Sequence, residues 1–395
     1  MEDGEIGVPG NGPNHVKSIV VLSSYAESLY NFRGDLIREL IAKGWRVHAL
    51  APDYDDAKRR KVEALGAIPV QILLQRNGMN PIKDLYALFM LCRLIRTIRP
   101  AIFFSYFMKP VIYGAIAAWL NHVPRTVVMV AGLGFVFINA NGTASFKKRI
   151  LRAVVSNLYR FAFNVSHQII FQNKDDLALM TEEAGAPPAR TTLINGSGVN
   201  LERFPRREKW EQGETLSFIW TGRLLREKGV VELVEATELL RNQGFEFNVT
   251  LVGGTDTNPG SLTAEEVRSW HEKGIVEWVG KVDDVHPYLR RSHVFVLPSY
   301  REGLPRSTQE AMATGLAIIT TDVPGCRETV TDGVNGILVP ARSTQGIVEA
   351  MTRYLRDHAL VARHGQASRA LAESRFDVRV INARMISALL GRSDR

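Results

Sequence analysis

Short apolar runs alternate with amphipathic stretches along most of the chain. In the first half, strand-like runs lie at Ser18–Ser23, Arg46–Ala51, Pro69–Leu73, Ala101–Ser105, Arg125–Val130 and Gln168–Phe171. Helix-like stretches between them include Arg33–Lys43, Asp55–Leu65 and Leu85–Arg99. The runs are continuously apolar, which is typical of strands buried on both faces. The pattern therefore predicts an α/β fold with a parallel sheet covered by helices.

The pattern stops at a polar, charged stretch and then begins again. Further strands are expected at Leu216–Thr221, Asn248–Val252, Val276–Trp278, Val294–Leu297, Ala317–Thr321 and Gly336–Val339. This predicts two Rossmann-like doubly wound domains, residues 15–198 and 215–375, joined by a linker at 199–214. We expect a disordered leader at 1–14 and a C-terminal helix at 376–395 that packs back on the first domain. In such sheets ligands bind at the carboxyl ends of the strands, so the cleft between the domains is the expected site.

Composition restricts the class of protein without identifying it. The 395 residues are 45% apolar and 23% charged, as in ordinary soluble proteins. The two cysteines, Cys92 and Cys326, are far apart, which favours reduced thiols in the cytosol. No apolar stretch reaches the roughly 18 residues of a spanning helix, and residues 1–14 lack the features of a signal peptide.

The net charge of +8 lies entirely in the first half of the chain. Met1–Asn195 holds 23 Lys and Arg against 15 Asp and Glu, whereas Gly196–Arg395 holds 26 of each. This asymmetry is compatible with an anionic partner such as a phosphorylated substrate, an anionic membrane surface or nucleic acid. It is equally compatible with a basic surface that has no partner.

The most informative motif holds two glutamates eight positions apart. Glu302 follows a strand-like run, and Glu310 lies inside a helix-like stretch, with Gly303 and Pro305 at the turn between them. The N-terminus of such a helix binds phosphates, and flanking carboxylates can accept hydrogen bonds from sugar hydroxyls. This arrangement suits a nucleotide sugar.

Cations are expected at the same edge of the second sheet. Arg223 and Lys228 follow the strand that ends near Thr221, in the stretch Thr221–Gly229. They suit a diphosphate leaving group, although alone they would indicate only a solvated loop. Gly222, Gly253, Gly280 and Val282 also follow strands, where a base or sugar can lie against backbone.

In this order, these elements resemble the carboxyl-terminal domain of the retaining GT-B glycosyltransferases, of the glycosyltransferase family 4-like kind. The resemblance implies that Arg223 and Lys228 bind the donor diphosphate. It implies that Glu302 contacts the donor sugar and Glu310 the ribose hydroxyls. Gly303 and Leu304 would supply phosphate-facing N–H groups.

The first half resembles one bacterial subgroup of this family. That subgroup attaches sugars to undecaprenyl-diphosphate-linked intermediates of surface polysaccharide and glycan assembly. The resemblance lies in Ser28–Arg33, in Lys109–Gly114 and in Gly132–Phe137. It implies acceptor-side roles for Asn31, Arg33, Lys109, Tyr113 and Gly132. The glycine pair and the histidine common in the wider family are absent.

Two basic amphipathic stretches bear on a lipid-linked acceptor. Phe146–Arg160 combines five Lys and Arg with several aliphatic residues, and we expect it to lie on an anionic membrane. Pro81–Arg99 has a similar pattern, and we expect an ordinary core helix with a solvated basic face.

The sequence thus predicts a metal-independent hexosyltransferase without cofactors, peripheral at the inner face of the plasma membrane. The donor is expected to be a UDP-sugar, and the sugar an N-acetylhexosamine or a hexose. The acceptor is expected to be a polyprenyl-diphosphate-linked saccharide. The resemblance implies front-face displacement with retention. The alternatives are a UDP-sugar epimerase of the same fold and a non-catalytic nucleotide-sugar-binding protein at the membrane. Nucleic acid is not expected, since no recognisable module is present.

Overall fold

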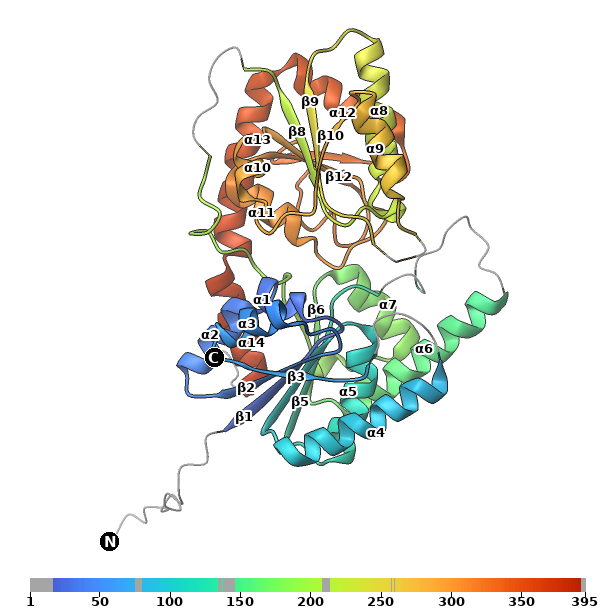
Figure 1. The fold of residues 1–395 in the computed structure, drawn as a ribbon, viewed down its shortest axis with the longest axis vertical. Coiled ribbons are helices and arrows are strands. Elements are labelled where there is room, and N and C mark those ends of the chain that lie inside the picture. The colour runs from blue at the N-terminus through green and yellow to red at the C-terminus, as the bar shows by residue number, and fades with distance from the viewer. Residues whose placement is uncertain are drawn as a thin grey trace.

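A computed structural model describes residues 17–74, 80–133, 137, 146–207, 214–256, 258 and 260–391. The expected leader at 1–14 and residues 134–136 of the Gly132–Phe137 motif lie outside this set. The described chain forms two lobes, stacked one above the other (Figure 1). Each lobe has its own parallel sheet and its own buried core.

The first sheet has seven strands in the order β3-β2-β1-β4-β5-β6-β7, and the second has six in the order β10-β9-β8-β11-β12-β13. The strands of the first sheet are β1 Ser18–Leu22, β2 Arg46–Ala51, β3 Ile68–Gln71, β4 Ile102–Tyr106, β5 Arg125–Val130, β6 Gln168–Phe171 and β7 Thr191–Leu193. Those of the second are β8 Ser217–Thr221, β9 Asn248–Val252, β10 Glu277–Gly280, β11 Val294–Leu297, β12 Ala317–Thr321 and β13 Gly336–Val339. All the pairings are parallel, so the predicted doubly wound α/β fold is confirmed.

Helices cover both sheets. Those of the first lobe are α1 Glu27–Asn31, α2 Gly34–Ala42, α3 Asp56–Glu63, α4 Pro81–Ile98, α5 Met108–Leu120, α6 Phe146–Val165 and α7 Lys174–Ala184. The second lobe holds α8 Val230–Asn242, α9 Ala264–Glu272, α10 His286–Arg290, α11 Arg306–Thr314, α12 Thr344–Arg356 and α13 His358–Leu371, and the chain ends with α14 Val378–Leu390.

Local sequence explains where several helices begin. The Asn80 side chain accepts from the N–H groups of Ile82 and Lys83, and Pro81 occupies the first helical position of α4. α4 therefore begins four residues before the expected Leu85. The helix expected at Arg33–Lys43 is α2, which begins at Gly34, directly after Arg33.

The described chain crosses between the two lobes twice. Within the expected linker, Val199 and Phe204 are buried in the core of the second lobe. α14 then returns to the first lobe, where Met385 and Leu389 join the core beneath β4 and β5. Arg125 on β5 donates from Nε to the Leu389 carbonyl at 2.7 Å, so the end of α14 is tied to the first sheet. Figure 1 shows α14 running down from the upper lobe onto the lower one.

One face of the first lobe leaves many large apolar side chains exposed. We call it the α4–α6 face; its exposed apolar residues are Ile82, Leu85, Tyr86 and Phe89 of α4, Trp119 and Leu120 of α5, and Phe146, Ile150, Val154 and Phe161 of α6. The ring of Trp119 meets Phe161 edge-on at 5.5 Å, which joins α5 to α6. Leu91 and Ile95 of α4 are buried in the core and Arg93 is exposed, as expected for a core helix with a solvated basic face. Ile82 is 81% exposed, so α4 also has an apolar surface that the described chain leaves uncovered.

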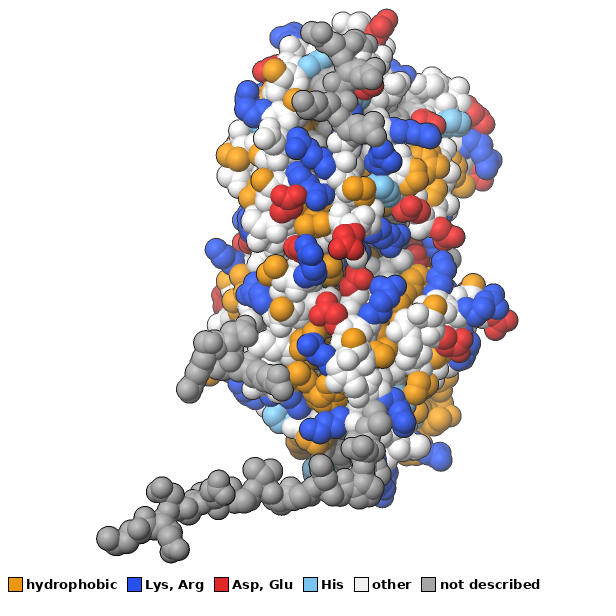
Figure 2. Space-filling model, turned by 90° about the vertical axis from the view of Figure 1, so that its left-hand side faces the viewer, with side chains coloured by type: hydrophobic (Ala, Val, Ile, Leu, Met, Phe, Trp, Pro, Cys, Tyr) orange, Lys and Arg blue, Asp and Glu red, His pale blue; other side chains and the backbone are white. Residues whose placement is uncertain are grey.

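The side of the molecule seen in Figure 2 is different. Lys and Arg side chains are interspersed there with Asp and Glu over both lobes. Such mixed charge is typical of an ordinary solvated surface.

Candidate active site

The loop between β11 and α11 holds the first predicted glutamate. Ser299 Oγ donates to Glu302 Oε1 at 2.8 Å, and Lys228 Nζ forms an ion pair with the same oxygen. The Lys228 and Glu302 side chains are only 18% and 13% exposed. Lys228 ends a single 3-10 turn, after which Gly229 adopts φ 69°. A Cβ at Gly229 would lie 2.1 Å from the Pro298 carbonyl oxygen, so only glycine lets the two loops approach.

The second predicted cation lies at the end of β8. Arg223 Nη1 pairs with Asp256 Oδ2 at 2.7 Å, and its side chain stays 44% exposed. Next to it, a Cβ at Gly253 would lie 1.8 Å from the Gly222 carbonyl oxygen. Gly280 ends β10 with φ 84°. Bare backbone therefore lines the ends of three adjacent strands, β8, β9 and β10, beside an accessible guanidinium.

The second predicted glutamate lies one turn into α11. Glu310 Oε1 accepts from Arg306 Nε at 2.9 Å, and both side chains are largely buried. Arg306 also lies over the ring of Phe32, at 5.8 Å from its centroid, so it reaches the first lobe. Among the described residues no side chain caps the N-terminus of α11. Its backbone N–H groups and positive dipole end can therefore serve an anionic ligand.

The two lobes meet at the same loop. A Cβ at Gly303 would lie 2.8 Å from the Gly132 backbone nitrogen, so the two backbones touch with no room for a side chain. Asn173, at the end of β6, donates from Nδ2 to the Gly303 carbonyl at 2.6 Å. Arg301 forms an ion pair with Asp176, which is fully buried. We call Gly132, Asn173, Asp176, Arg301 and Gly303 the clasp.

Burial distinguishes the clasp from other ion pairs between the lobes. Lys281 pairs with Glu27 at 3.3 Å and Lys61 with Asp283 at 3.5 Å, but these side chains are more than a third exposed and such pairs contribute little. In the clasp, burial raises the pKa of Asp176, although Arg301 and Asn173 favour its charged form. The clasp therefore holds the loop that carries Glu302 against the first lobe.

Arg33 is the most unusual of the predicted acceptor-side residues. It is 2% exposed, and Nη2 contacts Met129 Sδ at 2.8 Å. Its guanidinium lies 5.4 Å from the ring centroid of Tyr106. Nε and Nη1 have no hydrogen-bond acceptor among the described residues. Burial lowers the pKa of Arg33 to about 10, so it remains a cation at neutral pH, with Arg306 as a neighbouring positive charge.

The remaining acceptor-side residues divide into two groups. Asn31, two residues before Arg33 in the chain, donates to Glu27 Oε1 at 3.4 Å. Gly132 belongs to the clasp. Lys109 and Tyr113 on α5 instead both bind Asp84 on α4, at 2.7 and 3.3 Å. Burial, together with Asp84, raises the pKa of Tyr113 to about 12. These two residues therefore tie α4 to α5.

Of the donor-side residues that remain, Leu304 and Val282 pack into the second lobe. Leu304 is 8% exposed and belongs to the buried core, and Val282 packs against it. A Cβ at Gly196 would lie 2.6 Å from Leu304 Cδ2, so Leu304 also meets the chain that leaves the first sheet.

Several residues of the site were not expected from the sequence. Arg306 stands four positions before Glu310, a spacing that favours a helical ion pair, and that signal was available. Asn173 precedes Asp175 and Asp176, which is typical of a helix N-cap. Its reach to Gly303 depends on how the lobes pack, and no sequence pattern reveals that. Within the described ranges, no cluster of three or more His, Cys, Asp or Glu side chains could hold a metal ion.

Comparison with known proteins agrees with this geometry. Residues 34–203 match the family model described as "Glycosyltransferase Family 4", and residues 215–357 match "Glycosyl transferases group 1". One match falls on each of the two α/β lobes. The chain belongs to the GT-B glycosyltransferases.

Two relatives and one solved structure show how far the similarity extends. The chain is 28% identical over 352 residues to the N,N'-diacetylbacillosaminyl-diphospho-undecaprenol alpha-1,3-N-acetylgalactosaminyltransferase of Campylobacter jejuni, covering 86% of this chain and 89% of the relative. It is 28% identical over 293 residues to the UDP-Gal:alpha-D-GlcNAc-diphosphoundecaprenol alpha-1,3-galactosyltransferase of Escherichia coli, covering 72% and 73%. The sucrose-phosphate synthase structure from Thermosynechococcus elongatus superposes with a TM-score of 0.76 at 19% identity, over 95% of this chain and all of that one.

Substitution of Asn173 by Ser separates the clasp from the helix cap. Asn173 Oδ1 accepts from the Asp176 N–H at 2.7 Å, and Ser keeps this cap while losing the N–H donor to Gly303. An unpaired buried carbonyl costs about 1–3 kcal/mol, so we expect the KM for the donor to rise about tenfold with a modest fall in Tm. Steady-state kinetics and thermal unfolding measure both. An unchanged donor KM would show that the clasp does not position the loop.

Substitution of Arg33 by Met tests whether its buried charge is kept for function. Met fits among Met129, Phe104 and Tyr106, and replacing a buried unpaired charge by an apolar group is neutral or stabilising. We expect Tm to rise by a few degrees while sugar transfer falls at least tenfold. The exposed Arg60→Met variant serves as control for both readouts. A lower Tm with activity lost only in proportion to unfolded protein would assign Arg33 a structural role.

Proposed function

We propose that this protein transfers a sugar, an N-acetylhexosamine or a hexose, from a UDP-sugar to a polyprenyl-diphosphate-linked saccharide. We propose that transfer retains the anomeric configuration and needs no metal ion. The enzyme would act at the inner face of the plasma membrane in the assembly of a bacterial surface polysaccharide or glycan.

The donor site rests on one arrangement above all: Lys228 is held on Glu302 beside the uncapped N-terminus of α11. A diphosphate at this position would meet Lys228, Arg223 and the positive end of the helix dipole. Glu302 would accept from the sugar hydroxyls and Glu310 from the ribose hydroxyls. The Escherichia coli relative is named for the donor UDP-Gal, which supports the choice of nucleotide.

The proposed chemistry is a front-face displacement. The leaving diphosphate would help to deprotonate the acceptor hydroxyl while the bond to the donor sugar breaks on the same face. Two cations and the helix terminus would stabilise the charge that develops on the leaving group. Because Arg223 and Lys228 are already paired with Asp256 and Glu302, they are oriented before the donor arrives.

The acceptor is proposed from the α4–α6 face and from the relatives. The names of both relatives given above specify acceptor sugars linked to undecaprenyl diphosphate. On the α4–α6 face, exposed apolar residues alternate with basic ones, Lys147 and Arg149 among them, which suits the headgroup region of an anionic bilayer. Across the described ranges, no helix is long and apolar enough to span a membrane.

The donor assignment is tested with Arg223→Ala and Glu310→Ala. The proteins are incubated with a panel of UDP-sugars and membrane extract, and label entering lipid and UDP release are measured. Loss of a group that stabilises the leaving charge costs about 10²–10³ in rate, which we expect for Arg223→Ala. Arg226→Ala removes an exposed arginine of the same loop, paired with Glu266, and should leave the rate unchanged.

Three outcomes would contradict the proposal. Undiminished transfer by Arg223→Ala and Glu310→Ala would remove the donor assignment. Conversion of the UDP-sugar without acceptor would indicate an epimerase. Binding of UDP without any release of UDP from a donor would indicate a non-catalytic protein.

Membrane docking is tested by sedimentation with vesicles. The double substitution Ile82→Ser and Phe89→Ser removes exposed apolar area from α4 without altering charge. We expect at least a tenfold loss of binding to vesicles that contain anionic phospholipid, because the apolar side chains supply the insertion energy. Leu239→Ser, at an exposed apolar position in the second lobe, is the matched control. Equal binding by all three proteins would exclude the α4–α6 face as the docking surface.

A further inference from the structure

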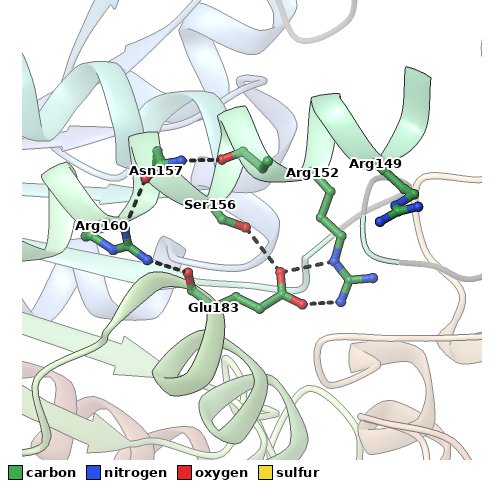
Figure 3. Close-up of a pocket in the computed structure, with 7 residues that line it drawn as sticks. Arg149, Arg152, Ser156, Asn157, Arg160 and Glu183 are labelled. Carbon is green, nitrogen blue, oxygen red and sulfur yellow. Dashed lines mark hydrogen bonds and ion pairs between the residues drawn. The ribbon is translucent and has the colours of Figure 1, made fainter. Parts of the chain in front are cut away.

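A pocket of about 460 Å³ lies on the outer side of the first lobe, between α6 and α7. It is lined by Arg149, Arg152, Ser156, Asn157 and Arg160 of α6 and by Glu183 of α7. Figure 3 shows Arg152 and Ser156 directed at the Glu183 carboxylate, Arg160 at the Glu183 backbone carbonyl, and Arg149 apart from them. Three arginines and one carboxylate line the pocket, so it carries excess positive charge.

Two of the arginines are held in place by the pocket itself. Arg152 Nε donates to Glu183 Oε2 at 3.0 Å, and Ser156 Oγ donates to the same oxygen at 3.1 Å. Arg160 donates from Nη2 to the Glu183 carbonyl and from Nη1 to Asn157 Oδ1, both at 3.1 Å. Their planes are therefore oriented before any ligand binds.

The third arginine has no such partner. Arg149 is exposed and forms no hydrogen bond or ion pair with the described residues. In Figure 3 it stands next to Arg152, on the side away from Arg160. A guanidinium beside a second, oriented one is the arrangement that binds phosphate oxygens well.

The pocket borders the apolar part of the α4–α6 face. Ile150 and Val154, both exposed, lie on α6 between the pocket arginines in sequence. A ligand in the pocket can therefore have a charged group on the arginines and a lipid chain in a bilayer that covers the apolar residues.

Phe137, which contacts a pocket arginine, is close in sequence to the clasp. The Arg152 guanidinium lies 5.5 Å from the ring centroid of Phe137. Phe137 stands five residues after Gly132, which touches Gly303 in the clasp. Five residues span at most about 18 Å, so Phe137 lies within about 18 Å of the clasp.

We propose that this pocket binds the diphosphate of the lipid-linked acceptor while the terminal sugar of that acceptor lies at the loop between β11 and α11 that carries Glu302. The inference rests on the proposed function and adds the residues that would bind the diphosphate. The polyprenyl chain would leave the pocket toward the bilayer.

Arg149→Gln is the variant that tests this proposal, because Arg149 has no partner among the described residues whose loss could disturb the fold. We expect the KM for the lipid-diphosphate-linked acceptor, assayed in detergent micelles without phospholipid, to rise about tenfold. The KM for the donor should not change. The KM for the free saccharide, used as a soluble acceptor without diphosphate, should also be the same for variant and wild type. Arg160→Gln should behave like Arg149→Gln, and Arg60→Gln, at an exposed site on α3, should behave like wild type.

Three results would overturn the proposal. Unchanged acceptor KM for both pocket variants would exclude the diphosphate as ligand. An equal rise in KM for the free saccharide would place the effect elsewhere. Weaker binding to anionic phospholipid vesicles with unchanged acceptor KM would assign the pocket to bilayer phospholipid. Failure of the proposed function is distinguishable, because the wild type would then transfer no sugar to either acceptor.

Discussion

The contact between Gly132 and Gly303 is the constraint on which the rest of the site depends. The two backbones are so close that a Cβ on Gly303 would overlap the first lobe at three points: Gly132, Ala131 and Gln172. The loop that carries Glu302 is therefore shaped by both lobes and belongs to neither alone. Asn173 and the buried pair of Asp176 with Arg301 fix the approach, since a buried charge without its partner is costly.

The charged side chains around the loop that carries Glu302 form ion pairs. Lys228 binds Glu302, Arg223 binds Asp256, and Arg306 binds Glu310. Each of these side chains is therefore held by its partner in one orientation. Arg33 differs because it is a cation without a carboxylate partner among the described residues.

The fold could be predicted from the sequence to the level of its two parallel sheets. Continuous apolar runs such as Val294–Leu297 and Ala317–Thr321 can be buried only in such a sheet, and both are strands. The three-residue edge strand β7 was not expected, because Thr191–Leu193 has no apolar run and is a strand only through its pairing with β6. The exposed apolar face of α4 was also missed, since the periodicity of a helix does not reveal whether its apolar stripe is covered.

For the candidate site, the sequence contains information about which residues pair within one element. It does not reveal which residues of different elements come into contact. The proximity of Lys228 to Glu302 could be expected because β8 and β11 are neighbours whose carboxyl ends share an edge. The partners Ser299 and Arg306 lie within four residues of their glutamates, and the sequence contains that information. Asn173 and Asp84 act across 130 and 25 residues of chain, so their partners depend on the packing of lobes and helices.

The first lobe has two surfaces that matter here: its contact with the second lobe and the α4–α6 face. At Gly132 its backbone lies directly against the Gly303 backbone of the second lobe, with no room for a side chain between them. Its α4–α6 face is apolar and uncovered by the described chain, so it requires an apolar neighbour. Phe137 lies between the two, packed under Arg152 and against Tyr159. Phe137 is therefore the described residue that contacts both the pocket arginine Arg152 and the core of the first lobe, and it stands five residues after Gly132 of the clasp.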